Sequence, residues 1–239
     1  MKTRSFISAI ISVVVASVLL TGCNWILTTK EAGPLATKEY DLTDFNVVEV
    51  ADAFKVDISP SDTFSVEITV NEDVMRYVRV TRNGSALKIG LEGLHISFGS
   101  RTIEARITMP ELTGLSLSGA SKGTVRGFSS ANEFSTRISG ASTLDLDMET
   151  GSLIGEVSGA SKVIARIKST RAEIELSGAS TVTLDIETGS FVYEASGASS
   201  ASGSLRSDSV TMHLTGASEM HLTGSAGNLK LSGSGASEA

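Results

Sequence analysis

The sequence of 239 residues is short of cysteine, histidine and aromatic residues. Its one cysteine is Cys23, so no disulfide can form within the chain and the hydrophobic core alone must hold the fold together. Aromatic residues make up 5% of the chain and Trp25 is the one tryptophan, so a carbohydrate site built on stacked rings has little material. The sequence also lacks a His/Cys cluster for zinc and a phosphate-binding loop, and we predict no cofactor.

An excess of positive charge is absent as well. Lysine and arginine number 20 against 27 acidic residues, which gives a net charge of −7. Nucleic-acid-binding proteins carry basic patches, and anionic lipid also attracts basic segments, so the charge argues against both partners. It is compatible with divalent cations and with neutral partners.

The N-terminus lacks an apolar run long enough to span a membrane. Lys2 and Arg4 precede an apolar stretch from Phe6 to Leu20, which is shorter than the roughly 20 residues of a spanning helix. A basic start, an apolar core and small residues are typical of a secretory signal. The sequence Leu-Thr-Gly-Cys ending at Cys23 resembles a bacterial lipobox, which implies cleavage after residue 22 and lipid attachment to the cysteine. The alternative is a free thiol in a secreted protein.

This reading divides the chain into a signal peptide over 1–22 and a flexible tether over 23–39, which lacks any periodic pattern. The lipid anchor makes the membrane a partner. In enteric bacteria, aspartate directly after the lipidated cysteine retains a protein at the inner membrane. Asn24 stands at that position here, which favours the outer membrane, with the periplasmic or surface-exposed face left open.

A tetrapeptide repeat dominates the rest of the chain. The first step between copies is 21 residues and every later step is 19. A fixed period with β-type residues between copies is typical of a solenoid. We therefore predict an all-β fold, a parallel β-solenoid with 19-residue coils over 111–239 and right-handed winding. Ser-Gly-Ala-Ser begins at Ser118, Ser139, Ser158, Ser177, Ser196 and Ser234, and Thr-Gly-Ala-Ser begins at Thr215.

Alternation of side chains predicts the shape of one coil. Even positions from Ile174 to Ile186 share one face, and the parity changes to odd positions from Phe191, across a polar turn. The tetrapeptide is expected to form a gentle corner whose Gly and second Ser point inward. A local bulge at the Gly would exchange the Gly and Ala faces, and this alternative stays open.

Residues 40–110 lack the tetrapeptide but still alternate, and we expect an irregular β section that caps or starts the solenoid. At the C-terminus only small and polar residues follow Gly233, which would blunt an open sheet edge. Self-association through the solenoid ends is a further expectation.

The 19-residue period predicts which outward side chains form columns. Two columns alternate in charge: Asp147, Arg166, Asp185; and Glu149, Lys168, Glu187, Arg206. Opposite charges on neighbouring strands stabilise a sheet, so these columns are interpreted as setting register and solubility.

One column departs from this rule. Glu156, Glu175 and Glu194 stack between Arg137 and His213. Stacked carboxylates repel one another, and hard cations favour carboxylate oxygens, so the three glutamates are the only candidates for a divalent cation site. The alternative, which we favour, is that Arg137, His213 and solvent relieve the repulsion and that no metal binds.

Catalytic patterns are weak. Gly119 to Gly123 matches the Gly-x-Ser-x-Gly pattern around Ser121, but the other copies of the repeat lack the second glycine, and nothing places His213 or His221 nearby. The glutamate column is the one candidate for a polysaccharide-active β-helix enzyme, a lyase or hydrolase, which is the alternative function. We predict no catalytic residue and no enzyme.

The motifs together resemble a known family. The segments are Leu42–Val50, Asn83–Ile89, Ile107–Leu112 and Leu115–Ser121 with its copies. They are similar to the putative auto-transporter adhesin, head GIN domain family, over roughly 40–237. The resemblance implies a β-helical domain on a secreted or lipid-anchored envelope protein. The sequence thus predicts a non-catalytic lipoprotein that serves as a structural or adhesive module for an envelope polysaccharide or protein.

Overall fold

The computed structural model describes residues 33–93 and 101–239. The predicted signal peptide, the predicted lipidation site Cys23 and most of the predicted tether lie outside the described residues. Gly33–Ala239 is one compact unit that contains all described strands and the whole described core. Within these ranges no helix is both long enough and apolar enough to cross a membrane.

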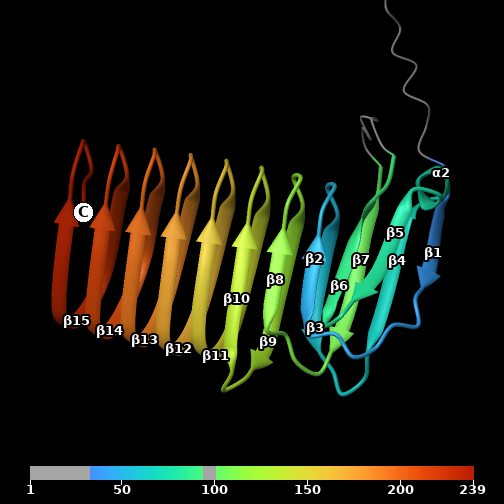
Figure 1. Ribbon diagram of the computed structural model, residues 1–239, viewed down its shortest axis with the longest axis horizontal. Coiled ribbons are helices and arrows are strands. Elements are labelled where there is room, and N and C mark those ends of the chain that lie inside the picture. The colour runs from blue at the N-terminus through green and yellow to red at the C-terminus, as the bar shows by residue number, and fades with distance from the viewer. Residues whose placement is uncertain (1–32, 94–100) are drawn as a thin grey trace, which may run out of the picture. The chain divides into compact units, whose positions relative to one another are not determined.

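The C-terminal half is a stack of coils, each made by one long strand that folds around the core (Figure 1). Each strand pairs in parallel with the strand 19 residues later, so Leu144, Val163 and Val182 form one buried column. The prediction of a parallel β-solenoid with 19-residue coils is confirmed. These strands are β11 (Thr143–Val157), β12 (Lys162–Leu176), β13 (Thr181–Ala195), β14 (Ser200–Leu214) and β15 (Glu219–Gly233).

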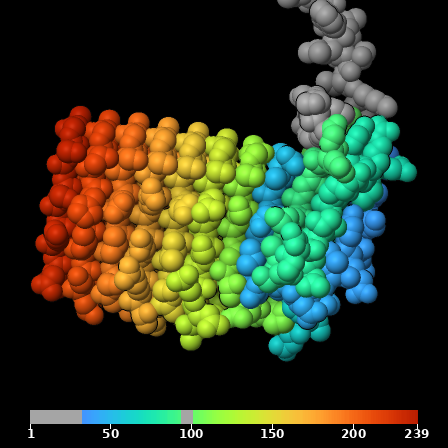
Figure 2. Space-filling view, in the orientation of Figure 1, coloured from blue at the N-terminus to red at the C-terminus, as the bar shows by residue number. Residues whose placement is uncertain are grey.

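Each coil is flattened and has two sides (Figure 1), and the inward side chains of both sides are buried in the core. The first half of β11 pairs with β9 (Lys122–Ser129), and its second half pairs with β10 (Glu133–Ile138). We call the two broad faces of the stack the β9 side and the β10 side. Figure 2 shows successive coils as parallel bands that lie against one another, as the ladder register requires.

The parity of the inward side chains changes once in each coil, as expected. In β13 the buried residues Leu184 and Ile186 are followed by Phe191 and Tyr193 on the other side. The predicted polar turn is instead a bend inside a continuous strand, because the ladder to β12 continues through the residues on both sides of Gly189. A Cβ at Gly189 would lie 2.8 Å from the carbonyl oxygen of Thr170, so the coils approach closely at this bend.

The tetrapeptide closes the opposite edge of each coil as a tight turn, not as the gentle corner expected. Gly178 has φ +73°, and the N–H of Ala179 donates to the carbonyl of Gly159 in the preceding coil at 2.8 Å. The buried Ser180 hydroxyl donates to the carbonyl of Ser177 at 2.8 Å, so the second Ser points inward as predicted. The inward placement of the Gly was wrong: Gly178 and Ala179 are both exposed, because the turn interrupts the strand alternation.

The single 21-residue step has a structural cause. The pairing of β9 with β11 shifts register between Arg126 and Phe128, which leaves Gly127 as an extra, bulged residue with φ +83°. A second extra residue is taken up between Ser129 and Glu133, because Ser129 pairs 20 residues ahead and Glu133 pairs 19 ahead. The bulge therefore widens the first regular coil on the β9 side.

The expected irregular section over 40–110 has an ordered topology that the sequence did not predict. Its strands β2 and β3 form a coil that stacks directly on β8 and β9 in parallel. Strands β6 and β7 stack in parallel on the other side of that coil. The spatial order of coils is therefore β6–β7, β2–β3, β8–β9, whereas the chain visits β2–β3 first. The bounds are β2 (Val47–Val50), β3 (Lys55–Pro60), β6 (Ala86–Leu91), β7 (Ile103–Met109) and β8 (Gly114–Leu117).

Antiparallel strands close the N-terminal end of the core. Strand β4 (Ser65–Asn71) pairs with β7, β1 (Leu35–Glu39) pairs with β4, and β5 (Val78–Asn83) pairs with β6. The short helix α2 (Glu72–Met75) joins β4 to β5, and the inward side chains of this cap are buried. The predicted tether was too long at its C-terminal end, because Leu35–Glu39 gains a full antiparallel ladder and is a strand.

Tyr193 offers a test of the core. Its ring stacks on Phe191 with centroids 6.0 Å apart, but its buried hydroxyl has no hydrogen-bond partner among the described residues. Burial raises the pKa of this phenol. Because an unpaired buried hydroxyl is unfavourable, we expect Tyr193→Phe to raise the free energy of unfolding by about 1 kcal/mol in urea denaturation. Tyr77→Phe, at a partly exposed residue, is the control; a loss of stability in Tyr193→Phe alone would contradict the interpretation.

Candidate functional site

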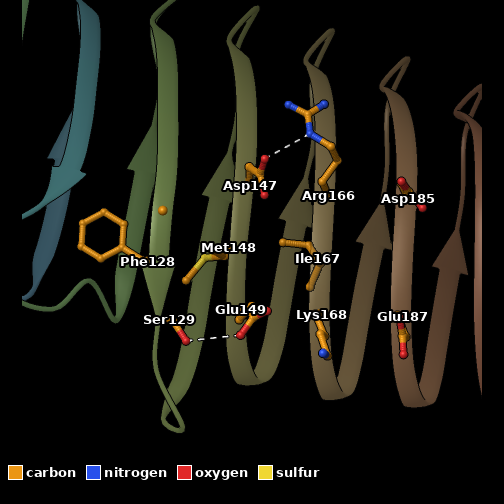
Figure 3. A pocket seen from close by; sticks show the side chains of 11 residues that line it. Phe128, Ser129, Asp147, Met148, Glu149, Arg166, Ile167, Lys168, Asp185 and Glu187 are labelled. Atoms are coloured by element: carbon orange, nitrogen blue, oxygen red, sulfur yellow. Dashed lines mark hydrogen bonds and ion pairs between the residues drawn. The ribbon is translucent and has the colours of Figure 1, made fainter.

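An open groove of about 450 Å³ on the β9 side crosses neighbouring coils beside the Gly127 bulge (Figure 3). Charged side chains of both signs line it, and the apolar side chains beneath belong to the core. A second groove of about 460 Å³ lies at the bend edge. The two grooves adjoin, because the charged residues Lys168 and Glu187 line both. The first groove is lined by Gly127, Phe128, Ser129, Asp147, Met148, Glu149, Arg166, Ile167, Lys168, Asp185 and Glu187.

Arg166 links two coils at the upper part of this groove. Its guanidinium lies 3.3 Å from a carboxylate oxygen of Asp147 and 3.0 Å from one of Asp145 (Figure 3 draws the first contact). Arg126 approaches Asp145 at 2.6 Å, and the hydrogen bond to this carboxylate raises the pKa of Arg126. Asp185, on the far side of Arg166, accepts a hydrogen bond from Ser204 at 2.6 Å. The predicted column of alternating charge is confirmed in its register.

The lower part of the groove carries the second alternating column. Glu149, Lys168 and Glu187 are direct register partners on successive coils. Ser129 donates to Glu149 at 3.4 Å, whereas Lys168 has no ion pair within 4 Å in the part of the chain that the structure describes (Figure 3). Exposed charged side chains contribute little to stability, so Glu149, Lys168 and Glu187 are available to an external partner at low energetic cost.

The glutamate column lies on the opposite, β10 side. Glu156, Glu175 and Glu194 are register partners, as expected, with Arg137 and His213 at the two ends. Arg137 holds Glu156 at 2.7 Å, and this hydrogen bond lowers the pKa of the carboxyl group. In residues 33–93 and 101–239 no group of three or more His, Cys, Asp or Glu side chains is arranged to hold a metal ion. The geometry thus adds no support to the cation hypothesis, and we do not propose a metal site.

Ser121, the residue of the weak nucleophile pattern, is a structural serine. Its side chain is 1% exposed, and its hydroxyl donates to the carbonyl of Ser118 at 2.7 Å. His213 and His221 belong to β14 and β15, several coils further along the stack. The structure therefore does not bring these residues together as a catalytic group.

Sequence reasoning found the charged columns but missed the groove they line. One end of the groove lies at the bulge at Gly127, which displaces Phe128 by one position relative to the regular coils. The one signal available was the step of 21 residues in place of 19, which marks the coil where the register changes.

Comparison with known proteins adds family and fold. The pattern of the family described as putative auto-transporter adhesin, head GIN domain, matches residues 44–185. A putative adhesin from Bacteroides fragilis is similar in structure, with TM-score 0.78, 15% identity, and 86% of this chain and 95% of that chain covered. A putative adhesin from Parabacteroides merdae is also similar, with TM-score 0.69, 18% identity, and 86% of this chain and 96% of that chain covered. A putative lipid binding protein from Parabacteroides distasonis is similar with TM-score 0.67, 17% identity, and 86% of this chain and 96% of that chain covered. No protein of curated function matches the chain.

Proposed function

We propose a function from the premise that this chain belongs to the putative auto-transporter adhesin, head GIN domain family. In this proposal the chain is a non-catalytic binding module of the bacterial cell envelope. The names of the family and of its structural neighbours fit an adhesive role. The coil stack is a stiff support, since each coil is bonded to its neighbours along its whole length.

The observation that carries the proposal is the charged groove on the β9 side. Carboxylates and basic groups alternate there from coil to coil, at the strand spacing of about 4.8 Å. An open surface of this kind suits an extended polymer, a polysaccharide or a protein, better than a small molecule, which needs a more enclosed pocket. We assign the groove as the contact surface for such a polymer.

A lipid anchor would hold this module at the membrane. The support for it is the Leu-Thr-Gly-Cys sequence ending at Cys23, and Asn24 favours the outer membrane. Strand β1 begins at Leu35, so the tether in this proposal comprises residues 23–34. The module would then stand close to the membrane surface, at the distance that a short segment permits.

The alternative of a polysaccharide-active enzyme gains no support from the described residues. The Ser121 hydroxyl is buried and bonded, and the glutamates of the β10 side lie on an outer face with Glu156 paired to Arg137. A glycosidase needs two carboxyl groups on either side of one bond in a cleft, which this flat column does not provide.

A binding screen with residues 33–239 tests the proposal, using isolated envelope polysaccharides and envelope proteins as probes. We expect at least one polymer to bind, and the double variant Arg166→Glu/Lys168→Glu to weaken its affinity by about tenfold or more, because two positive charges are reversed in the groove. Both side chains are exposed, so the variant should keep its fold.

Arg171→Glu is the matched control, since Arg171 is an exposed arginine of the same coil but on the β10 side. Its affinity should stay within about twofold of the unmodified protein. Absence of binding to every probe would refute the adhesive function. Equal losses in the two variants would refute the assignment to the groove.

A further inference from the structure

The core is open at its C-terminal end. In β14 the inward residues Val210 and Met212 are 1% and 7% exposed. Their register partners in β15, Leu229 and Leu231, are 63% and 49% exposed, although they point in the same direction. Strand β15 is the last described strand of the stack (Figure 1), and within the described chain β14 covers these leucines on one side only.

The backbone of β15 is open along the same edge. Its inner edge pairs with β14 throughout. On its outer edge, the described chain supplies one bridge, from Glu219 to Glu238, and one further bond in which Met220 donates to Glu238 at 2.8 Å. The remaining outward N–H and C=O groups, from residue 221 to 233, are a template for another strand.

An apolar groove of about 300 Å³ lies between the two sides of this last coil. It is lined mainly by Leu205, Val210, Met212, Leu222 and Leu229. In the preceding coils the same space is filled by the inward side chains of the next coil. Whatever covers the end must therefore supply strand backbone and apolar side chains at alternate positions.

Charge does not oppose the approach of a second copy at this end. The chain has a net charge of −7, but residues 200–239 contain two basic and three acidic side chains. Lys230 on the β10 side and Glu219 on the β9 side have opposite signs. At the N-terminal end the described core is covered instead, because Val70 and Val74 of the cap are 0% and 2% exposed.

We propose that two copies of this chain join end to end through β15, each copy covering the leucines and the strand edge of the other. A second copy has what the surface requires, since its own β15 presents an open strand with apolar side chains at alternate positions. The contact is isologous, with the same patch on both partners. Because the contact uses the same single patch on both copies, assembly through it stops at the dimer and does not continue into a filament.

Sedimentation equilibrium of residues 33–239 tests this inference, which does not depend on the proposed ligand. We expect the mass to rise toward twice that of the monomer as concentration increases, up to about 1 mM. The double variant Leu229→Lys/Leu231→Lys should raise the dissociation constant at least tenfold. Both side chains are about half exposed or more in the single chain, so their replacement should not unfold it.

Leu35→Lys is the matched control, because Leu35 is 59% exposed at the other end of the molecule. It should leave the dissociation constant unchanged. Spin labels add the orientation: residues 33–239 contain no cysteine, so a label at Thr223→Cys should give a short distance between copies and one at Thr37→Cys a much longer one. A monomer at all concentrations, a mass beyond the dimer, equal effects of the two lysine variants, or the reverse order of label distances would each overturn the proposal.

Discussion

Gly178→Ala should lower the free energy of unfolding by roughly 3 kcal/mol. Gly178 has φ +73°, a conformation that costs other residues about 1–2 kcal/mol. A Cβ there would lie 2.6 Å from the carbonyl oxygen of Gly159 and 3.0 Å from its nitrogen, both backbone atoms of the preceding coil. The coils would have to separate, which adds a cost comparable to overpacking a core, about 1–3 kcal/mol. Urea denaturation followed by circular dichroism measures the change.

Gly84→Ala separates the two causes. Gly84 has φ +60° in the turn between β5 and β6, but no atom lies within 4 Å of a Cβ placed there. This variant should lose about 1–2 kcal/mol, from backbone strain alone. If Gly178→Ala were no more harmful than Gly84→Ala, the close approach of corners would not limit the coil spacing, and the tetrapeptide would matter only for its turn.

Deletion of one whole coil of 19 residues should be tolerated, whereas deletion of 18 residues at the same place should not. Deletion of residues 184–202 takes out 19 residues and joins Thr183 to Gly203, so all later inward residues stay inward. The new ladder places 203–214 on β12, with Ile167 below Leu205. Because repeat proteins are stabilised mainly by contacts between neighbouring units, we expect a cooperative unfolding transition with stability lower by a few kcal/mol, on the order of one repeat's contribution.

Deletion of residues 184–201 makes the matched control. It joins Thr183 to Ser202 and reverses the parity of every later side chain, which turns Leu205 and Val210 outward. We expect loss of the C-terminal coils, seen as reduced strand signal and rapid proteolysis beyond residue 183. Similar thermal unfolding of the two deletion variants would contradict the register argument. Cooperative unfolding of the variant lacking residues 184–201, but not of the variant lacking residues 184–202, would also contradict it.

The sequence predicted the regular coils well because the length of a repeat specifies which distant residues are in contact. Once the period is known, residue n lies on residue n + 19, and alternation decides which side chains are buried. The pairing of Asp147 with Arg166 and of Glu156 with Glu175 follows directly, and both are confirmed. The inward second serine of the tetrapeptide also followed from parity, but its glycine did not, because a tight turn interrupts the alternation on which parity depends.

The N-terminal coils could not be predicted in the same way. Nothing in residues 40–110 states that β2 and β3 stack on β8 and β9 while β6 and β7 lie on the far side, because these contacts join unlike sequences that are distant in the chain. The charged groove has one end at the bulge at Gly127, a local change of register that the 21-residue step signals but does not locate within the coil.

The sequence by itself determined the all-β class, the 19-residue coil and the columns of stacked side chains, because periodicity and alternation are one-dimensional properties. The tertiary structure alone decided the order of the first coils, the cap at one end, the open core at the other and the depth of the groove. These features arise where the repeat begins, is interrupted or stops, so they depend on contacts between residues that no period relates.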